Sequence, residues 1–414
     1  MPNDMTFQQS VTLLNAIQQQ VTGQASAAPV DLQGFVSVAQ TLLKTGYDPV
    51  INAINQVLSR TIFSTRPYRR KFGLAEVSES AYGNHVRKIS VADQPIEDDD
   101  RYKWPVAYDA SQTANPLGNE QSVDMYTIKK PDVLQTNFYG ANVWQDHYTI
   151  FRDQLDCAFS SPEELSRFVA LVTGEMSNKI EQIREDMGRA CVINAAGGTL
   201  ASADAASTQF DLAHRVIPLL TMYNAYTGQS FTAQTVFQPA NFVAFVRWAF
   251  GIIQAVSDLM EQRSVKFQTI VNGKYVQRHT PKSEQRLYVA SQAANMISTM
   301  VRVQNFNDGF MTLPDGIQME SVAFWQNINA PLYINGACTM IGTDGTPTNV
   351  AALENPVPVL AYLHDREALG YATTQSWSAP TPLNARGGYT NIWMHETQRL
   401  YNDHSEKTCI FTLA

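Results

Sequence analysis

The stretch Val357-Pro358-Val359-Leu360-Ala361-Tyr362-Leu363 is followed at once by the charged cluster His364-Asp365-Arg366-Glu367. An apolar run that ends in charged residues predicts a buried strand leading into a polar turn. Further along, Thr408–Leu413 predicts a terminal strand, and Asn384–Tyr389, which contains two adjacent glycines, predicts a flexible connector. We therefore expect the chain to end inside a sheet, not in a tail.

The composition is that of a folded, core-forming protein. The 414 residues are 44% apolar and 16% charged, which allows two or three domains. The net charge of −8 argues against a generally basic surface that coats nucleic acid. It allows a shell that encloses DNA without binding it tightly. Met1–Met5 lacks the basic and apolar regions of a secretory signal, so we expect synthesis in a cytoplasm. The apolar run 242–256 is short and contains Arg247, which favours a buried helix over a membrane span.

Residues 6–60 predict three short helices. The second spaces its apolar residues helically between Leu32 and Leu43, and the third begins with Asp48 as a cap and Pro49 in the first turn. Because such short helices do not fold alone, their apolar stripes need a partner surface in this subunit or in a neighbour.

Between residues 61 and 150 the pattern changes to strand-like pieces around a polar middle. Val86–Val91 and Met125–Ile128 flank this middle, which is rich in Pro, Asp, Asn and Gly and has too little apolar surface to form a core. A long insertion of this kind is uncommon in a compact domain and is usually functional or docked on another surface.

The clearest helix of the chain begins at Ser161-Pro162-Glu163-Glu164, which combines a capping serine, an early proline and a capping-box glutamate. Apolar residues then recur at steps of three and four from Leu165 to Cys191. We expect the helix to end at Gly197-Gly198 after about 35 residues, roughly three times the usual length.

Residues 200–350 predict a mixed α+β segment without the regular alternation of a doubly wound sheet. We expect a helix over Asp211–Tyr226, a strand over Thr235–Gln238, a helix from Asn241 to about Gln262, a polar ribbon from Lys266 to Val276 and a strand over Leu287–Ala290.

This order of parts resembles the major capsid proteins of tailed phages, which have the HK97-like fold. The resemblance implies an α+β fold in five parts: a helical N-terminal arm at 1–60, an extended β loop with flanking strands at 61–150, the long spine helix of the peripheral domain at 151–205, an axial domain at 206–350, and C-terminal strands returning to the peripheral domain at 351–414. The extended loop would lie over an adjacent subunit, since an isolated two-stranded ribbon is marginal in water.

The resemblance also implies the function. We expect a structural protein, not an enzyme, that self-assembles through hexamers and pentamers into an icosahedral phage head around double-stranded DNA. Its location would be the virion, with assembly in the cytoplasm of the bacterial host. Scaffolding, portal and decoration proteins are further candidate partners, DNA contacts would be weak, and no membrane is expected.

Charged clusters supply the candidate assembly interface. The acidic run Glu97–Asp100 lacks the alternating spacing and the glycine of a calcium loop, so a solvated loop or a contact with a neighbour's basic segment remains open. The basic run of residues 66–71 could instead touch DNA phosphates. For Asp365 we expect an ion pair with Arg366 or with a neighbour's charge. The candidate interface residues are Arg66, Arg69, Arg70, Lys71, Asp98, Asp99, Asp100, Asp365 and Arg366.

We expect no catalytic, metal or cofactor site. His395-Glu396 lacks the second histidine of a zinc-hydrolase motif, and the four cysteines lack metal or disulfide spacing, so we expect reduced, buried thiols. Two alternatives remain open: an encapsulin-like shell that encloses a cargo enzyme, and a cytoplasmic hydrolase that uses Cys157 or Cys191 with a histidine.

Overall fold

The structure is a computed structural model of the 414-residue chain. It describes residues 7–23, 29, 31–46, 49–53, 72–76, 86–92, 126, 128–138, 140–202, 204–269, 276–295, 317–334, 338–341, 347–350 and 356–414.

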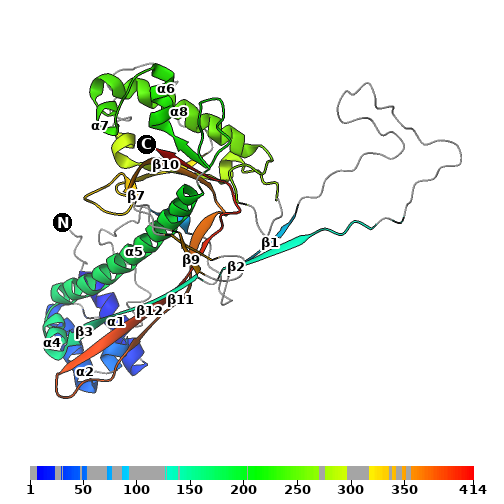
Figure 1. Cartoon of the computed structure of the whole chain (residues 1–414). Helices are drawn as coiled ribbons and strands as arrows, with labels where there is room; N and C mark the ends of the chain where they lie inside the picture. The colour runs from blue at the N-terminus through cyan, green and yellow to red at the C-terminus, as the bar shows by residue number, and fades with distance from the viewer. Residues whose placement is uncertain are drawn as a thin grey trace, which may run out of the picture.

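A helical bundle forms one end of the molecule (Figure 1). It consists of α1 (Phe7–Thr22), α2 (Leu32–Thr45), α4 (Arg152–Ala158) and the first turns of α5 (Pro162–Ala201). The helices bury their apolar stripes against one another and against Ile150 and Ile392 of a neighbouring sheet. The prediction that the short N-terminal helices need a partner surface is confirmed for α1 and α2, and residues 49–53 are also helical. Asp48, the predicted cap of the third helix, lies outside the described residues.

The sheet next to the bundle has three antiparallel strands in the order β11 (Leu369–Pro380), β12 (Tyr389–Asn402) and β3 (Gly140–Phe151). Side chains alternate along β12, so that Ile392, Met394, Glu396 and Gln398 are buried while their neighbours in sequence are not. The connector Asn384–Tyr389 is a structured turn rather than a flexible link, because the Asn384 side chain accepts hydrogen bonds from the backbone N–H groups of residues 386 and 387.

A larger sheet has helices on both faces. Its strand order is β4 (Val216–Pro218), β13 (Thr408–Thr412), β10 (Val357–Asp365), β5 (Gln285–Ala290) and β6 (Gln318–Val322), with β7 (Tyr333–Ile334) paired to the start of β10. Along β10, Ala361 and Leu363 pack on the side of α6 (Leu219–Thr227) and α8 (Pro239–Glu261), whereas Tyr362 packs on the side of α5. Strands buried on both faces read as continuous apolar runs, which is why β10 and β13 are predicted correctly.

Three of the predicted segments differ from the structure. Thr235–Gln238 lies in and just after the short helix α7 (Ala233–Val236), because Thr232 caps it and exchanges hydrogen bonds with Thr235. The helix expected over Asp211–Tyr226 begins later, at Leu219, after the strand β4. The predicted boundary between residues 350 and 351 does not follow the sheets, because β10 is hydrogen-bonded to β5, and β11 and β12 belong with β3.

The long helix α5 connects the two sheets. Ser161 caps it as predicted, accepting a hydrogen bond from the Glu164 backbone N–H at 3.2 Å. The helix spans 40 residues and continues through Gly197-Gly198, where the sequence predicts its end. The reason is tertiary: Gly198 lies directly against the imidazole of His404, and a Cβ at this position would overlap that ring. This glycine permits close packing instead of ending the helix.

The apolar helix α8 is long and apolar enough to cross a membrane, judged by length and composition. Its buried stripe includes Phe242, Phe245, Ile253 and Met260, which pack on the larger sheet, so the predicted buried helix is confirmed. The C-terminal end of α8 is held by the buried Lys407, whose ammonium donates to the carbonyl oxygens of residues 260 and 262 at 3.0 and 2.5 Å.

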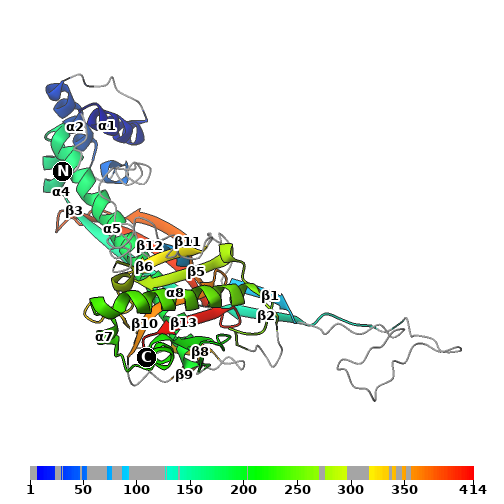
Figure 2. The same ribbon diagram turned by 90° about the horizontal axis from the view of Figure 1, so that it is seen from above.

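A two-stranded ribbon projects from the end of the molecule opposite the helical bundle (Figures 1 and 2). It pairs β1 (Val86–Val91) with β2 (Val133–Phe138), and one residue separates β2 from β3. The predicted two-stranded arm is therefore present, but its second strand is β2 and not Met125–Ile128. Shorter described elements are η1 (Gly73–Ala75), η2 (Lys282–Glu284) and the ribbon of β8 (Cys338–Ile341) with β9 (Pro347–Val350).

The two helical glycines Gly198 and Gly251 should respond oppositely to alanine. Gly251 of α8 has open space around a new Cβ, so G251A should raise the free energy of unfolding by about 0.5–1 kcal/mol through helix propensity. G198A should lower it by about 1–3 kcal/mol, because the new methyl group must displace His404. Urea unfolding of the unassembled subunit measures both, and a stabilised G198A would contradict the packing role of this glycine.

Candidate assembly site at the root of the arm

The β1–β2 ribbon exposes large apolar side chains on its outward side, although Leu134 on its inward side is buried. On β1, Lys88 and Ser90 turn inward and are partly buried, while Ile89 and Val91 are 56% and 55% exposed. Val133, the direct cross-strand partner of Val91, is 60% exposed. A free β ribbon on a soluble protein normally turns its large apolar residues inward, so this exposed apolar surface is a candidate contact surface.

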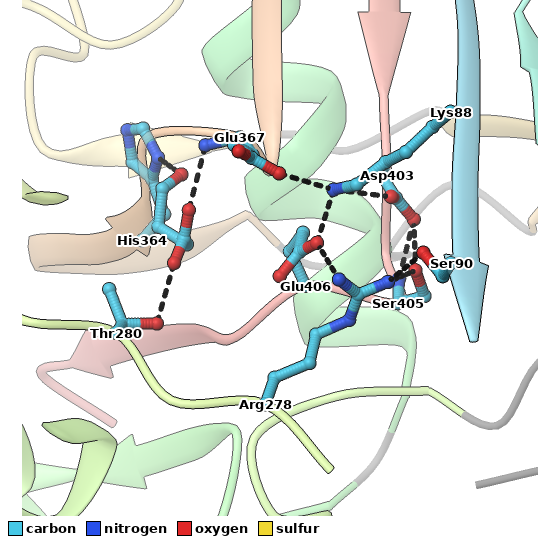
Figure 3. Close-up of polar contacts among 10 residues, drawn as sticks. Lys88, Ser90, Arg278, Thr280, His364, Glu367, Asp403, Ser405 and Glu406 are labelled. Carbon is cyan, nitrogen blue, oxygen red and sulfur yellow. Dashed lines mark hydrogen bonds and ion pairs between the residues drawn. The ribbon is translucent and has the colours of Figure 1, made fainter. Parts of the chain in front are cut away.

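Lys88 is held by three carboxylates from two turns of the larger body (Figure 3). Its ammonium lies 3.1 Å from Glu367 Oε2 and 3.2 Å from Asp403 Oδ2, and it donates to Glu406 Oε1. Glu367 follows the end of β10, and Asp403 and Glu406 lie in the turn between β12 and β13. The C-terminal strands therefore fix the root of the arm through charge.

Arg278 supplies a second cation to the same cluster. Its guanidinium pairs with Glu406 and donates to the hydroxyl groups of Ser90 and Ser405, each at 3.2 Å. Ser90 lies on β1, two residues after Lys88, so both inward side chains of this strand are engaged. Ser405 in turn donates to Asp403, which joins the cluster into one network.

The electrostatics hold Lys88 in its charged form. Burial alone lowers the pKa of Lys88, but the carboxylates of Glu406 and Asp403 outweigh this effect and raise the pKa above its ordinary value. Burial also raises the pKa of Glu406, and the attraction of Lys88 and Arg278 opposes that rise. Since Glu406 contacts both cations, we treat it as ionised at neutral pH.

Asp365 and His364 form the buried polar edge of this region. Asp365 accepts hydrogen bonds from the Thr280 hydroxyl at 2.6 Å and from the Glu367 backbone N–H at 2.8 Å, and burial raises its pKa. The His364 ring stacks on both Tyr288 and Tyr362, and its Nδ1 lies 2.7 Å from the Asp365 carbonyl oxygen. A carbonyl only accepts, so Nδ1 carries the proton of the neutral ring.

The prediction of an ion pair between Asp365 and Arg366 is wrong. Arg366 instead lies 3.4 Å from Glu284 Oε2, and its side chain is 55% exposed whereas Asp365 is 7% exposed. Consecutive residues at a strand end point to opposite sides, which separates the two charges. The remaining candidate interface residues lie outside the described residues; these are Arg66, Arg69, Arg70, Lys71, Asp98, Asp99 and Asp100.

The sequence analysis missed Lys88, Arg278, Asp403 and Glu406 as a unit. A signal was present in the polar turn Asp403–Lys407, where two acids and a lysine stand directly before the buried strand β13. Charges so close to a buried strand are expensive unless they are paired. The sequence does not show which distant residues pair with them.

The described residues contain no group of His, Cys, Asp and Glu side chains that could hold a metal ion. Cys191 and Cys409 are buried as predicted, whereas Cys157 is exposed, contrary to the prediction. Burial raises the pKa of the Cys191 thiol to about 12, which suppresses the thiolate that a hydrolase would need.

A long helix that joins two sheets, together with a charge-fixed arm whose apolar side faces outward, defines a structural protein built to contact copies of itself. The sequence model of the Phi29-like phage major capsid protein family matches residues 14–412. The chain belongs to this family. It is a structural major capsid protein of a phage virion, not an enzyme, and it assembles with copies of itself into an icosahedral capsid. The match does not favour the encapsulin-like alternative.

Two solved structures illustrate the likeness. A chain in "Structure of head fiber and inner core protein gp22 of native bacteriophage P68" is 10% identical, with 86% of this chain and 87% of that chain covered and a TM-score of 0.47. A chain in the capsid structure of Staphylococcus phage Andhra is 12% identical, with 86% and 87% covered and a TM-score of 0.46. No curated protein matches the sequence significantly.

Removing Lys88 should destabilise the subunit far more than removing its neighbour Arg87. K88M leaves Asp403 and Glu367 without this cation and Glu406 with Arg278 alone, so the free energy of unfolding should fall by about 3 kcal/mol. R87M changes an exposed residue of the same strand and should cost less than about 0.5 kcal/mol. Urea unfolding of unassembled subunits compares the two, and equal losses would show that the cluster does not fix the arm.

The buried histidines should make the subunit sensitive to acid. Burial lowers the pKa of His364 to about 4, against about 6.5 in the unfolded chain. Below pH 6.5 the unfolded chain therefore binds more protons than the folded one, and stability falls as the pH falls. For this histidine the loss approaches about 3 kcal/mol at pH 4.

Replacing His364 with phenylalanine tests this pH dependence. H364F keeps a ring in contact with Tyr288 and Tyr362 but cannot take up a proton. Its free energy of unfolding should fall less steeply than that of the wild type between pH 6.5 and 4, while comparison at pH 8 gives the fixed cost of the lost hydrogen bond. Parallel stability curves for the two proteins would contradict the assignment.

Proposed function

We propose that copies of this chain assemble through hexamers and pentamers into a shell around double-stranded DNA, and that the β1–β2 arm of each subunit docks on a neighbour. The observation that carries the proposal is the outward apolar surface of Ile89, Val91 and Val133, each more than half exposed on a ribbon that is fixed in place by charge. Burying the ions that hold this surface outward carries a desolvation penalty, and an exposed apolar patch is typical of an interaction site. We therefore assign this surface to a contact in the assembly.

Charged segments beyond the described residues extend the proposal. The run Asp98–Asp100 follows β1 in sequence, and the basic run at Arg66, Arg69, Arg70 and Lys71 precedes it. Opposite charges on neighbouring copies would direct their encounter and set the register of the contact. Asp365 and Arg366 flank the same root, where Arg366 remains half exposed and available to a neighbour in addition to Glu284.

The proposed function also includes further partners and a place of assembly. We place assembly in the cytoplasm of the bacterial host, with scaffolding, portal and decoration proteins as candidate partners and weak contacts to DNA at most. The net charge of −8 supports a shell that encloses DNA without binding its phosphates tightly. We expect particles purified from infected cells to contain nuclease-protected double-stranded DNA. Particles that enclose only an enzyme would refute the proposed function.

Replacing the outward apolar residues with threonine should block assembly without harming the subunit. I89T/V91T keeps two β-branched residues on β1, so urea unfolding of the unassembled chain should change by less than about 0.5 kcal/mol. Sedimentation should show subunits or small oligomers where the wild type forms shells. The control Q135T alters the same outward face without removing a large apolar side chain and should still assemble. Normal shells from I89T/V91T would refute the docking role of the arm.

A further inference from the structure

The segment that precedes β4 forms a short loop whose two ends are fixed. The backbone N–H of Val216 donates to the carbonyl oxygen of Asp204, and the N–H of Ala206 donates to the carbonyl oxygen of Val216, each at 2.9 Å. Ala206 and Leu212 are buried in the core that α6 and α8 share with the larger sheet. Motion of this loop is therefore confined to the residues between these two, 207–211, which we call the tip.

The side chain of His214 joins the fixed base of the loop to its tip. Its Nδ1 lies 2.6 Å from Asp204 Oδ1, and its Nε2 lies 3.0 Å from Asp211 Oδ2. Asp204 belongs to the base, where its other carboxylate oxygen accepts a hydrogen bond from the Arg215 backbone N–H at 3.2 Å. Asp211 is the last residue of the tip. A carboxylate only accepts, so both hydrogen bonds exist together only when both ring nitrogens of His214 carry a proton.

The groups around His214 favour this charged form. Hydrogen bonds to Asp204 and Asp211 raise the pKa of His214 above its ordinary value, and burial opposes them with a smaller effect. Arg215 directs its guanidinium to hydroxyl groups on other segments. From β13, the Cys409 thiol donates to the backbone carbonyl oxygen of His214 at 3.6 Å. The two aspartates therefore control the proton of His214.

Loss of that proton breaks one of the two hydrogen bonds, because neutral imidazole has one N–H group and one lone pair. Asp204 is the closer partner and is held by the Arg215 backbone N–H, so the remaining proton stays on Nδ1. Nε2 then turns a lone pair toward the Asp211 carboxylate, and two acceptors repel each other. Asp211 directly follows Phe210, which is 90% exposed. Opening this contact therefore frees the part of the tip that carries the phenylalanine.

We propose that His214 is a pH-operated latch, whose charged ring fixes the tip and Phe210 in one position and whose neutral ring releases them. The latch closes as the pH falls and opens as the pH rises through the pKa of His214, which lies above its ordinary value. A second hydrogen bond to the tip, from the Trp248 indole to Gln209 Oε1, is long at 3.4 Å and holds the tip only weakly.

The latch has a consequence for contacts made by the tip. An exposed ring that is held in one position loses less conformational entropy on contact than a mobile one. Any contact at Phe210 is therefore favoured below the opening pH and disfavoured above it. This direction is opposite to that of the buried His364, whose protonation destabilises the subunit.

Spin labelling of the tip tests the latch in the full-length, unassembled subunit. A nitroxide is attached through F210C in a C157S background, because Cys157 is exposed and would also react. The spectrum of labelled C157S alone is subtracted. We expect the rotational correlation time of the label to fall at least severalfold between about pH 6 and about pH 8.5. An equally immobile label, or an equally mobile one, at the two pH values overturns the proposal.

Three variants separate the latch from a general effect of pH. In D211N the side-chain oxygen can accept from the charged ring and the amide can donate to the neutral one, so the label should stay immobile at both pH values. H214A removes the ring, so the label should be mobile at both. H279Q replaces an exposed histidine of another segment and should respond to pH like the wild type.

The nearly isosteric D211N decides the question even where H214A does not fold. A label that loosens in D211N as much as in the wild type overturns the role of the contact between His214 and Asp211. Loss of the pH response in H279Q assigns the response to the other histidine and equally overturns the proposal.

Discussion

The ion pairs of Lys88 fix which side of the arm faces the body of the subunit. The orientation of the exposed apolar residues on the other side of the arm depends on them. Side chains on a strand alternate, so holding Lys88 and Ser90 inward forces Ile89 and Val91 outward. A one-residue slip of β1 would exchange the two sets, turning Ile89 and Val91 inward and Lys88 and Ser90 outward. The carboxylates of Glu406 and Asp403 therefore act as a register device. They specify the outward surface without needing to contribute much net stability.

The parts of the fold that the sequence predicts correctly are those with dense local signals. β10 and β13 are predominantly apolar because helices cover both faces of their sheet, and Ser161 and Pro162 mark the start of α5. The errors have two different causes. Gly198 predicts a helix end but makes room for His404, a contact that the local sequence does not contain. Thr235 predicts a strand residue but closes a capping box with Thr232, a local signal that competes with its strand preference.

The candidate site is predicted less well than the fold, for a physical reason. Lys88 and Glu406 are 318 residues apart, and neither belongs to a motif that would announce the pair. The arm itself is predictable from its shortage of apolar residues, but its second strand is displaced because β2 is fixed by pairing with β1 and by its continuation into β3. The outward face of the β11–β12–β3 sheet could be anticipated only once the register of the three strands was known, since its residues come from stretches far apart in sequence.

Charge and apolar surface are divided in the same way in the arm and in the neighbouring sheet. In the sheet, Glu396 and Asp146 turn inward to the cations of α5 and leave tryptophans outside; in the arm, Lys88 turns inward to carboxylates and leaves Ile89 and Val91 outside. Ion pairs position these elements in the single subunit, so the outward apolar surface is presented in a fixed geometry before a neighbour arrives. A preorganised surface loses less conformational entropy on contact than a mobile one. The ion pairs thus fix the orientation of these two elements, and their exposed apolar side chains are left for contacts in the assembly, where many identical contacts of modest strength can add up to a closed shell.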